Sequence, residues 1–179
     1  MTVVSGILKV EYHLFGVTDL AVGPFASGAV GPMRLVMQAV GGALIYTGIA
    51  MGPVHVAIEV RTRLPSEVDG SWEDIAEVSL EVAPPAQHPD GQAFLLQLAR
   101  EKGNDPEPRG FRVAVVGGGT PEEFPVLNPA GGSCRLRVHA RGRGMNYDCV
   151  DWEPHEEYLL VAWPAPVAEE AMYKQVTAY

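Results

Sequence analysis

The stretch VHVAIEVRTRL, Val54 to Leu64, has an apolar residue at every second position through Val60. Histidine, alanine, glutamate and arginine fill the positions between them. Successive side chains of a β-strand point to opposite faces, so a period of two predicts a strand with one buried face. A helix would need a period near 3.6 residues. This stretch therefore predicts a half-buried strand.

Two other stretches repeat the pattern, CRLRVHAR (Cys134 to Arg141) and DIAEVSLEV (Asp74 to Val82). Further strands are predicted at Gly6 to Leu14, Ala43 to Ile49, Phe94 to Leu98, Phe111 to Val116 and Tyr158 to Trp163. Turn signals separate them, among them Pro84-Pro85, Asp90-Gly91 and Pro129-Ala130-Gly131-Gly132. The chain thus reads as many short strands joined by turns.

This layout predicts an all-β protein, an antiparallel β-sandwich or jelly roll of about seven to nine strands. The segment 167–176, after Pro164 and Pro166, is compatible with a short C-terminal helix or with an extended tail. A length of 179 residues suits one domain spanning 1–179. Within it we expect a polar surface loop at 100–109 and a C-terminal tail at 164–179.

Composition narrows the class of partner. The chain is 47% hydrophobic and 20% charged, which is typical of a folded globular protein. Its formal net charge of −9 disfavours direct binding to nucleic acid or to an anionic membrane, because phosphate contacts need a basic surface. The same charge is compatible with a basic partner.

The stretch from Leu35 to Ile58 contains no Asp, Glu, Lys or Arg, and Gly48 and Gly52 stand in GxxxG spacing within it. A membrane span is therefore one interpretation. Gly41-Gly42 and the strand-like alternation that follows favour the other, two adjacent buried strands. The N-terminus lacks the pattern of a secretory signal, so we expect a cytoplasmic protein without membrane association.

The stretch VAVVGGGTPEE, Val113 to Glu123, resembles the beginning of a dinucleotide-binding turn. Such a turn needs a third glycine and a helix N-terminus that supplies free N–H groups to the phosphates. Here Glu122 occupies the third glycine position, and Pro125 and Pro129 follow where the helix should run. We therefore predict a strand and a glycine loop, with no cofactor.

Arg135, Arg137, His139, Arg141 and Arg143 form a basic stripe on one face of a predicted strand. An anion site is one interpretation. The other is pairing with Glu77 and Glu81, which have the same spacing on another predicted strand, across a solvated sheet face. The pairing requires no ligand, and we favour it.

The loop NYDCVDWEPHEEY, Asn146 to Tyr158, is the most acidic candidate site. Carboxylates near a histidine can bind a divalent cation, but the spacing matches no calcium loop, HExxH or paired CxxC motif. A solvated hairpin tip is the alternative. Cys134 and Cys149 are the only cysteines, and neither lies in a recognisable nucleophile motif.

The segments ILKVEYHLFGV, WEDIAEVSLEV, PAGGSCRLRVHARG and EEYLLVAWPAP carry a resemblance. Their layout resembles that of uncharacterised actinobacterial β-sandwich proteins and, more distantly, of the acidic inhibitors of DNA-entry nucleases associated with bacterial competence. The insert from Gln92 to Pro125 departs from the shorter inhibitors. The resemblance implies an acidic inhibitor or immunity-type protein, and it assigns no functional residue.

Charge and resemblance together predict a non-enzymatic binding protein that blocks a basic nuclease or toxin. We expect the partner to be bound by an acidic loop with an aromatic anchor, made of Asp148, Asp151, Trp152, Glu153, Glu156 and Glu157. Two other functions stay open. One is a small-ligand module, for example for a sugar stacked on Trp72, Trp152 or Trp163, and the other is a metal-dependent enzyme that uses the 148–157 loop.

Overall fold

The computed structural model describes residues 3–19, 34–65, 68–82, 101, 110–116, 119 and 121–178. Within them the chain forms ten β-strands, so the all-β prediction is confirmed for this part of the protein. The strands are β1 (Val3–Glu11), β2 (Leu14–Thr18), β3 (Val36–Ala39), β4 (Gly42–Tyr46), β5 (Met51–Val60), β6 (Asp74–Leu80), β7 (Arg112–Ala114), β8 (Cys134–Arg141), β9 (Glu157–Pro164) and β10 (Ala171–Lys174).

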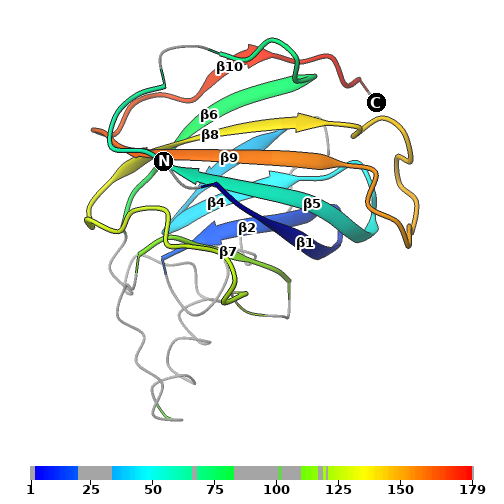
Figure 1. Cartoon of the computed structure of the whole chain (residues 1–179), viewed down its shortest axis with the longest axis horizontal. Helices are drawn as coiled ribbons and strands as arrows, with labels where there is room; N and C mark the ends of the chain where they lie inside the picture. The colour runs from blue at the N-terminus through cyan, green and yellow to red at the C-terminus, as the bar shows by residue number, and fades with distance from the viewer. Residues whose placement is uncertain are drawn as a thin grey trace.

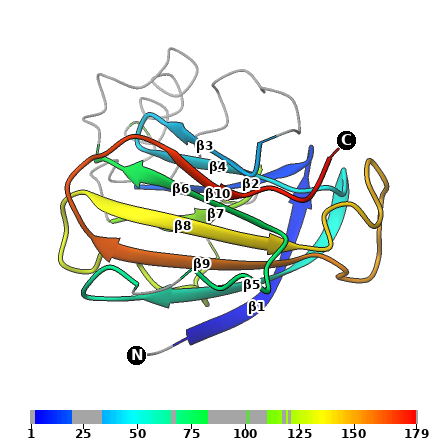
Figure 2. The ribbon, with the colours of Figure 1, turned by 90° about the horizontal axis from the view of Figure 1, so that it is seen from above.

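All ten strands belong to one sheet in the order β10-β6-β8-β9-β5-β1-β2-β4-β3, with β7 paired to β2. The pairs are antiparallel except β5 and β9, which run parallel, so the sheet is mixed where the sequence predicted an antiparallel one. β1 and β2 share only the pair Glu11 and Leu14, and the sheet turns sharply there. The result is a curled sheet that resembles a half-barrel (Figures 1 and 2).

The hydrophobic core fills the inside of this curl. Val54, Val56 and Ile58 of β5 are all buried in it, as their alternation predicted. The corresponding residues of β6 and β8 join them, together with Phe15 of β2 and Ile45 of β4. Because these side chains fill the inner face, a partner or ligand can reach only the outer face of the sheet and the loops at the strand ends.

The predicted strand from Gly6 to Leu14 is wrong in one respect: it is two strands. β1 ends at Glu11, Tyr12 and His13 form a two-residue turn, and β2 begins at Leu14. Two-residue hairpin turns usually contain glycine, asparagine or aspartate, which favour positive φ. Tyrosine and histidine carry no such signal.

The charge-free run from Leu35 to Ile58 folds into β3, β4 and most of β5. It thus contributes three strands where two were predicted. None of the described segments is a helix with the length and hydropathy needed to cross a membrane. The apolar run reflects burial of these strands in the core.

The C-terminal segment is extended, and its predicted helical alternative is wrong. β10 pairs with the edge of β6. Beyond it, the N–H groups of Val176 and Thr177 both donate to Asp74 Oδ1, at 2.8 and 3.0 Å. These bonds to a sheet edge and a buried carboxylate favour the extended backbone over local helix formation.

Several predicted features lie outside the described residues. They are the strand Phe94 to Leu98, the turns at 84–85 and 90–91, the loop 100–109 apart from Glu101, and Gly117 and Gly118 of the glycine stretch. Before those glycines, β7 is a short strand, and residues 121–128 after them contain no helix.

Candidate functional site

Three loops meet at one end of the sheet and form a surface that we call the platform. It comprises residues 12–13 between β1 and β2, residues 47–50 between β4 and β5 with Met51 at the start of β5, and residues 142–155 between β8 and β9. These loops lie together at the right-hand end of the molecule in Figures 1 and 2. They come from distant parts of the sequence.

Backbone hydrogen bonds join the three loops. The His13 N–H donates to the Ala50 carbonyl at 3.1 Å, and the Ala50 N–H donates to the Cys149 carbonyl at 2.9 Å. The Asp148 N–H in turn donates to the Gly48 carbonyl at 2.9 Å. Because main-chain bonds connect every loop to another, the platform is held in shape independently of its exposed side chains.

Two glycines allow the loops to approach this closely. A Cβ atom on Gly48 would lie 1.8 Å from the Arg143 carbonyl oxygen, and one on Gly52 would lie 2.4 Å from the Asp151 carbonyl oxygen. Both distances are far below van der Waals contact. The GxxxG spacing that suggested a membrane helix therefore serves to pack the 142–155 loop against the β4–β5 loop.

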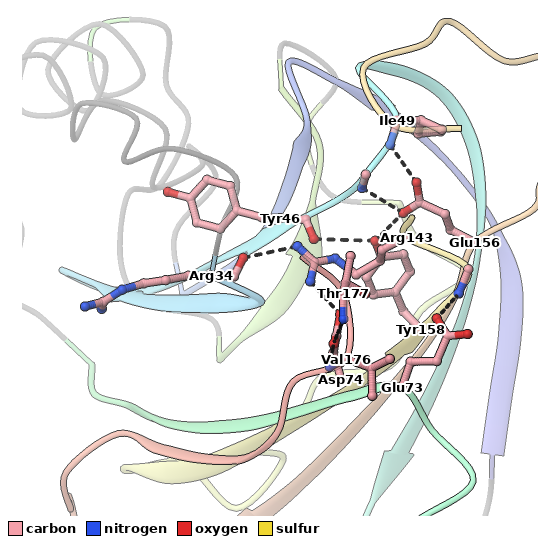
Figure 3. Close-up of polar contacts among 12 residues, drawn as sticks. Arg34, Tyr46, Ile49, Glu73, Asp74, Arg143, Glu156, Tyr158, Val176 and Thr177 are labelled. Carbon is pink, nitrogen blue, oxygen red and sulfur yellow. Dashed lines mark hydrogen bonds and ion pairs between the residues drawn. The ribbon is translucent and has the colours of Figure 1, made fainter. Parts of the chain in front are cut away.

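A buried carboxylate binds the backbone of the β4–β5 loop on the interior side of the platform. Glu156 is 1% exposed, and it accepts hydrogen bonds from the N–H groups of Gly48 and Ile49 and from the Tyr158 hydroxyl (Figure 3). Burial raises the pKa of Glu156 above its ordinary value, although these hydrogen bonds oppose the shift. The side chain therefore serves to position the β4–β5 loop.

A second buried pair anchors the beginning of the 142–155 loop. Arg143 is 1% exposed and donates to Asp74 Oδ2 at 2.7 Å and to the Arg34 carbonyl at 3.2 Å (Figure 3). Burial by itself would raise the pKa of Asp74, but hydrogen bonds from Thr177, Arg143 and Val176 outweigh burial and lower it. Asp74 is therefore held as a carboxylate that ties the loop to the C-terminal segment.

Backbone strain is concentrated on the platform. Among the described residues, the non-glycine residues with positive φ are Tyr12 at 56°, His13 at 61° and Asp148 at 59°. All three lie on the platform, and His13 Nε2 lies 3.0 Å from Asp148 Oδ1. Left-handed backbone costs an ordinary residue about 1–2 kcal/mol, and such strain gathers at functional sites.

Replacing Tyr12 by asparagine is expected to raise the free energy of unfolding by about 1 kcal/mol, because asparagine tolerates the left-handed region better than tyrosine. Little packing is lost, since Tyr12 is 70% exposed. Urea denaturation of the two proteins measures the difference. A variant no more stable than the wild type would mean that the strain at Tyr12 is negligible.

The platform exposes large apolar side chains between its carboxylates. Trp152 is 87% exposed, the most of any large hydrophobic residue among those described. The other exposed apolar side chains of the platform are Tyr12, Met51, Met145, Tyr147 and Val150. Asp148 and Glu153 are exposed beside them, while the one arginine of these loops, Arg143, is buried. The surface is therefore both apolar and acidic.

The structure separates the six residues predicted to bind a partner. Asp148, Trp152 and Glu153 are exposed on the platform. Asp151 is turned inward, where its Oδ1 accepts the N–H groups of Trp152 and Glu153 and thereby orders the loop around the tryptophan.

The other two predicted residues do not belong to the exposed loop. Glu156 is buried, so its assignment to a partner surface is wrong; its carboxylate finds backbone donors in the interior that the sequence does not reveal. Glu157 begins β9, faces the outer side of the sheet and pairs with Arg141.

The histidines and carboxylates of the 148–157 loop are directed to different partners. Asp148 contacts His13, and Asp151 contacts Asn146 and lies 3.7 Å from His155. No group of three or more potential metal ligands occurs in the described residues.

The two cysteines lie in different environments. Cys134 lies in the core, where burial raises its pKa to about 12, and Cys149 is exposed.

The basic stripe is paired and buried at Arg135 and Arg137, whereas Arg141 is exposed and pairs with Glu157. Glu77 accepts from Arg135 at 2.8 Å and from Arg137 at 3.0 Å, and all three side chains are buried. The expected cross-strand pairing is thus confirmed for Glu77, whereas the expectation of a solvated face is wrong at Arg135 and Arg137. Tyr173 and the backbone of the C-terminal segment cover these groups, and Glu81 lies exposed beyond the end of β6.

Sequence reasoning missed Tyr12, His13, Met51 and Met145 as site residues. Tyr12 and His13 stood inside one predicted strand, and the methionines carry no motif. Nothing local in the sequence indicates that these residues meet, because long-range strand pairing brings them together.

Comparison of the chain with family models, with curated proteins and with solved structures gave no match. Function is therefore inferred from the chain's own residues.

Proposed function

We propose that the protein binds a partner protein with a basic surface through the platform, and that it acts as an inhibitor of a nuclease or toxin. The observation that carries this proposal is that strained backbone and exposed apolar side chains occur on the same surface. The three strained non-glycine residues of the described chain lie on the same surface as its most exposed tryptophan. Residues in sparsely populated backbone regions cluster at binding and active sites.

The exposed side chains of the platform have the composition of a protein interface. Tryptophan and tyrosine dominate the binding energy of most interfaces, and methionine is enriched there. The platform presents Trp152, Tyr12, Tyr147, Met51 and Met145 on a scaffold whose backbone is already ordered. Pre-organisation reduces the entropy lost on binding, so this surface suits a tight complex.

Charge specifies the partner. Asp148 and Glu153 are exposed on the platform, and the chain carries a net charge of −9. A negative surface on a negative protein attracts a basic partner and repels nucleic acid, which is the behaviour required to occupy the substrate cleft of a nuclease.

The test is affinity capture from the native host with two baits, the wild type and the charge-reversed variant D148K/E153K. We expect the wild type to retain a basic protein that the variant retains at least about tenfold less, because steering by complementary charge changes association by that order or more. The captured protein should degrade nucleic acid or be toxic, and the wild type should inhibit it. The control E122K/E123K makes the same change in net charge on exposed residues outside the platform.

With the partner in hand, Trp152→Ala is expected to raise Kd about 30-fold, corresponding to ~2 kcal/mol, mainly through faster dissociation. D148K/E153K should instead slow association and reduce its dependence on salt. Surface plasmon resonance at low and high salt separates the two effects. Equal capture by both baits, or a captured protein that the wild type does not inhibit, would refute the proposal.

A further inference from the structure

We infer that the outer face of strands β1, β5 and β9 is a binding groove for a neutral carbohydrate, separate from the platform. The groove has a volume of about 620 Å³, within the range of small-ligand sites. All the residues that line it belong to the part of the chain that the structure describes. They include Trp72, one of the three tryptophans that the sequence suggested for ligand stacking. Of the other two, Trp163 is buried and Trp152 belongs to the platform.

Strand register explains why the sheet is hollowed here. Ser5 of β1 pairs with Ala57 of β5, which pairs with Leu159 of β9, and these three side chains form the floor. Serine and alanine are short, so the floor is low. Val3 and Ile7 of β1 are exposed along one side, and Trp72 lines the groove as well.

Trp72 is fixed in place before any ligand arrives. Its main-chain N–H donates to the Asp69 carbonyl, and its main-chain carbonyl accepts from Lys174 Nζ at 2.7 Å, so the backbone that carries the indole is held on both sides. The Arg141 guanidinium lies 5.0 Å from the centre of its ring, and the His139 ring lies 5.7 Å away. The C–H face of a sugar ring can stack on an ordered, half-buried indole beside a groove with little loss of entropy.

The polar groups of the groove suit hydroxyl groups. Ser5 and His55 are exposed there, and each can donate or accept. Glu59, which is buried, and Glu157, which is half-buried, also line it. A ligand with many hydroxyl groups on its edge and an apolar ring face matches both sets of contacts.

Charge balance makes the ligand neutral. Glu59 accepts two hydrogen bonds from Arg61, at 2.7 and 2.9 Å, and Glu157 is paired with Arg141. Each carboxylate of the groove therefore already has a cation beside it. A charged ligand would have to compete with these pairs, whereas a neutral sugar leaves them intact.

The experiment measures binding of cellotetraose, maltotetraose, xylotetraose and triacetylchitotriose by isothermal titration calorimetry and saturation-transfer NMR. We expect at least one of them to bind with a Kd of about 1 mM, typical of a shallow site. Trp72→Ala should weaken that binding at least tenfold, and Trp152→Ala, as the matched control, should leave it unchanged.

A second variant, Ser5→Leu, raises the floor of the groove and leaves Trp72 in place, so it decides the matter if Trp72→Ala does not fold. We expect it to abolish binding while thermal melting stays cooperative. The inference is overturned if none of the four sugars binds with a Kd below about 10 mM, or if Ser5→Leu binds as the wild type does. The neutral class is overturned if a charged trisaccharide, either the cationic deacetylated chitotriose or the anionic trigalacturonic acid, binds more tightly than all four neutral sugars. None of these outcomes bears on the partner captured through the platform.

Discussion

Gly48→Ala is expected to lower the free energy of unfolding by about 3 kcal/mol or more. The new Cβ would stand 1.8 Å from the Arg143 carbonyl oxygen, a backbone atom that no side-chain rotation can move. The 142–155 loop would have to withdraw. Glu156 would then lose its hydrogen bonds from Gly48 and Ile49 and remain buried without them.

Gly70→Ala is the matched control for this prediction. No atom lies within 4 Å of a Cβ built on Gly70, so the same chemical change should alter stability by less than about 0.5 kcal/mol. Urea denaturation of both variants gives the comparison. If Gly48→Ala proves as stable as Gly70→Ala, the close packing of the platform loops is wrong.

Arg143→Met is expected to lower the free energy of unfolding by about 3–5 kcal/mol, because it leaves the Asp74 carboxylate buried without its cation. Methionine has a similar length and keeps most of the packing. The double variant R143M/D74N should recover part of the loss. Asparagine removes the unpaired charge and can still accept the N–H groups of Val176 and Thr177 through its side-chain oxygen.

The pH dependence of Arg143→Met provides an independent check. In the wild type the pKa of Asp74 is lowered, so its contribution to stability is present above the unfolded pKa and is lost as pH falls through the lower folded pKa. Arg143 supplies one of the hydrogen bonds that lower this pKa, so the folded pKa of Asp74 should rise in Arg143→Met, and the destabilisation relative to the wild type should shrink as pH falls and Asp74 takes up a proton. A destabilisation that stays constant between pH 7 and 3 would contradict this account.

Alternation in the sequence determined the class of fold and the facing of its main strands. Val54, Val56 and Ile58 point inward because a strand has a period of two, and only the apolar side can be buried at a net gain. The same rule located β8 at its observed bounds and placed its arginines on the other face. These are local properties, and a single sequence contains them.

Tertiary structure decided what covers each face and which loops meet. Arg135 and Arg137 of β8 are buried because Tyr173 and the C-terminal segment close over them, and Glu156 is buried where two distant N–H groups donate to its carboxylate. The platform depends on the approach of the Gly48 and Arg143 backbones, which lie on loops far apart in the chain. Such contacts depend on long-range strand pairing, and periodicity specifies only which way a side chain points, not what it will touch.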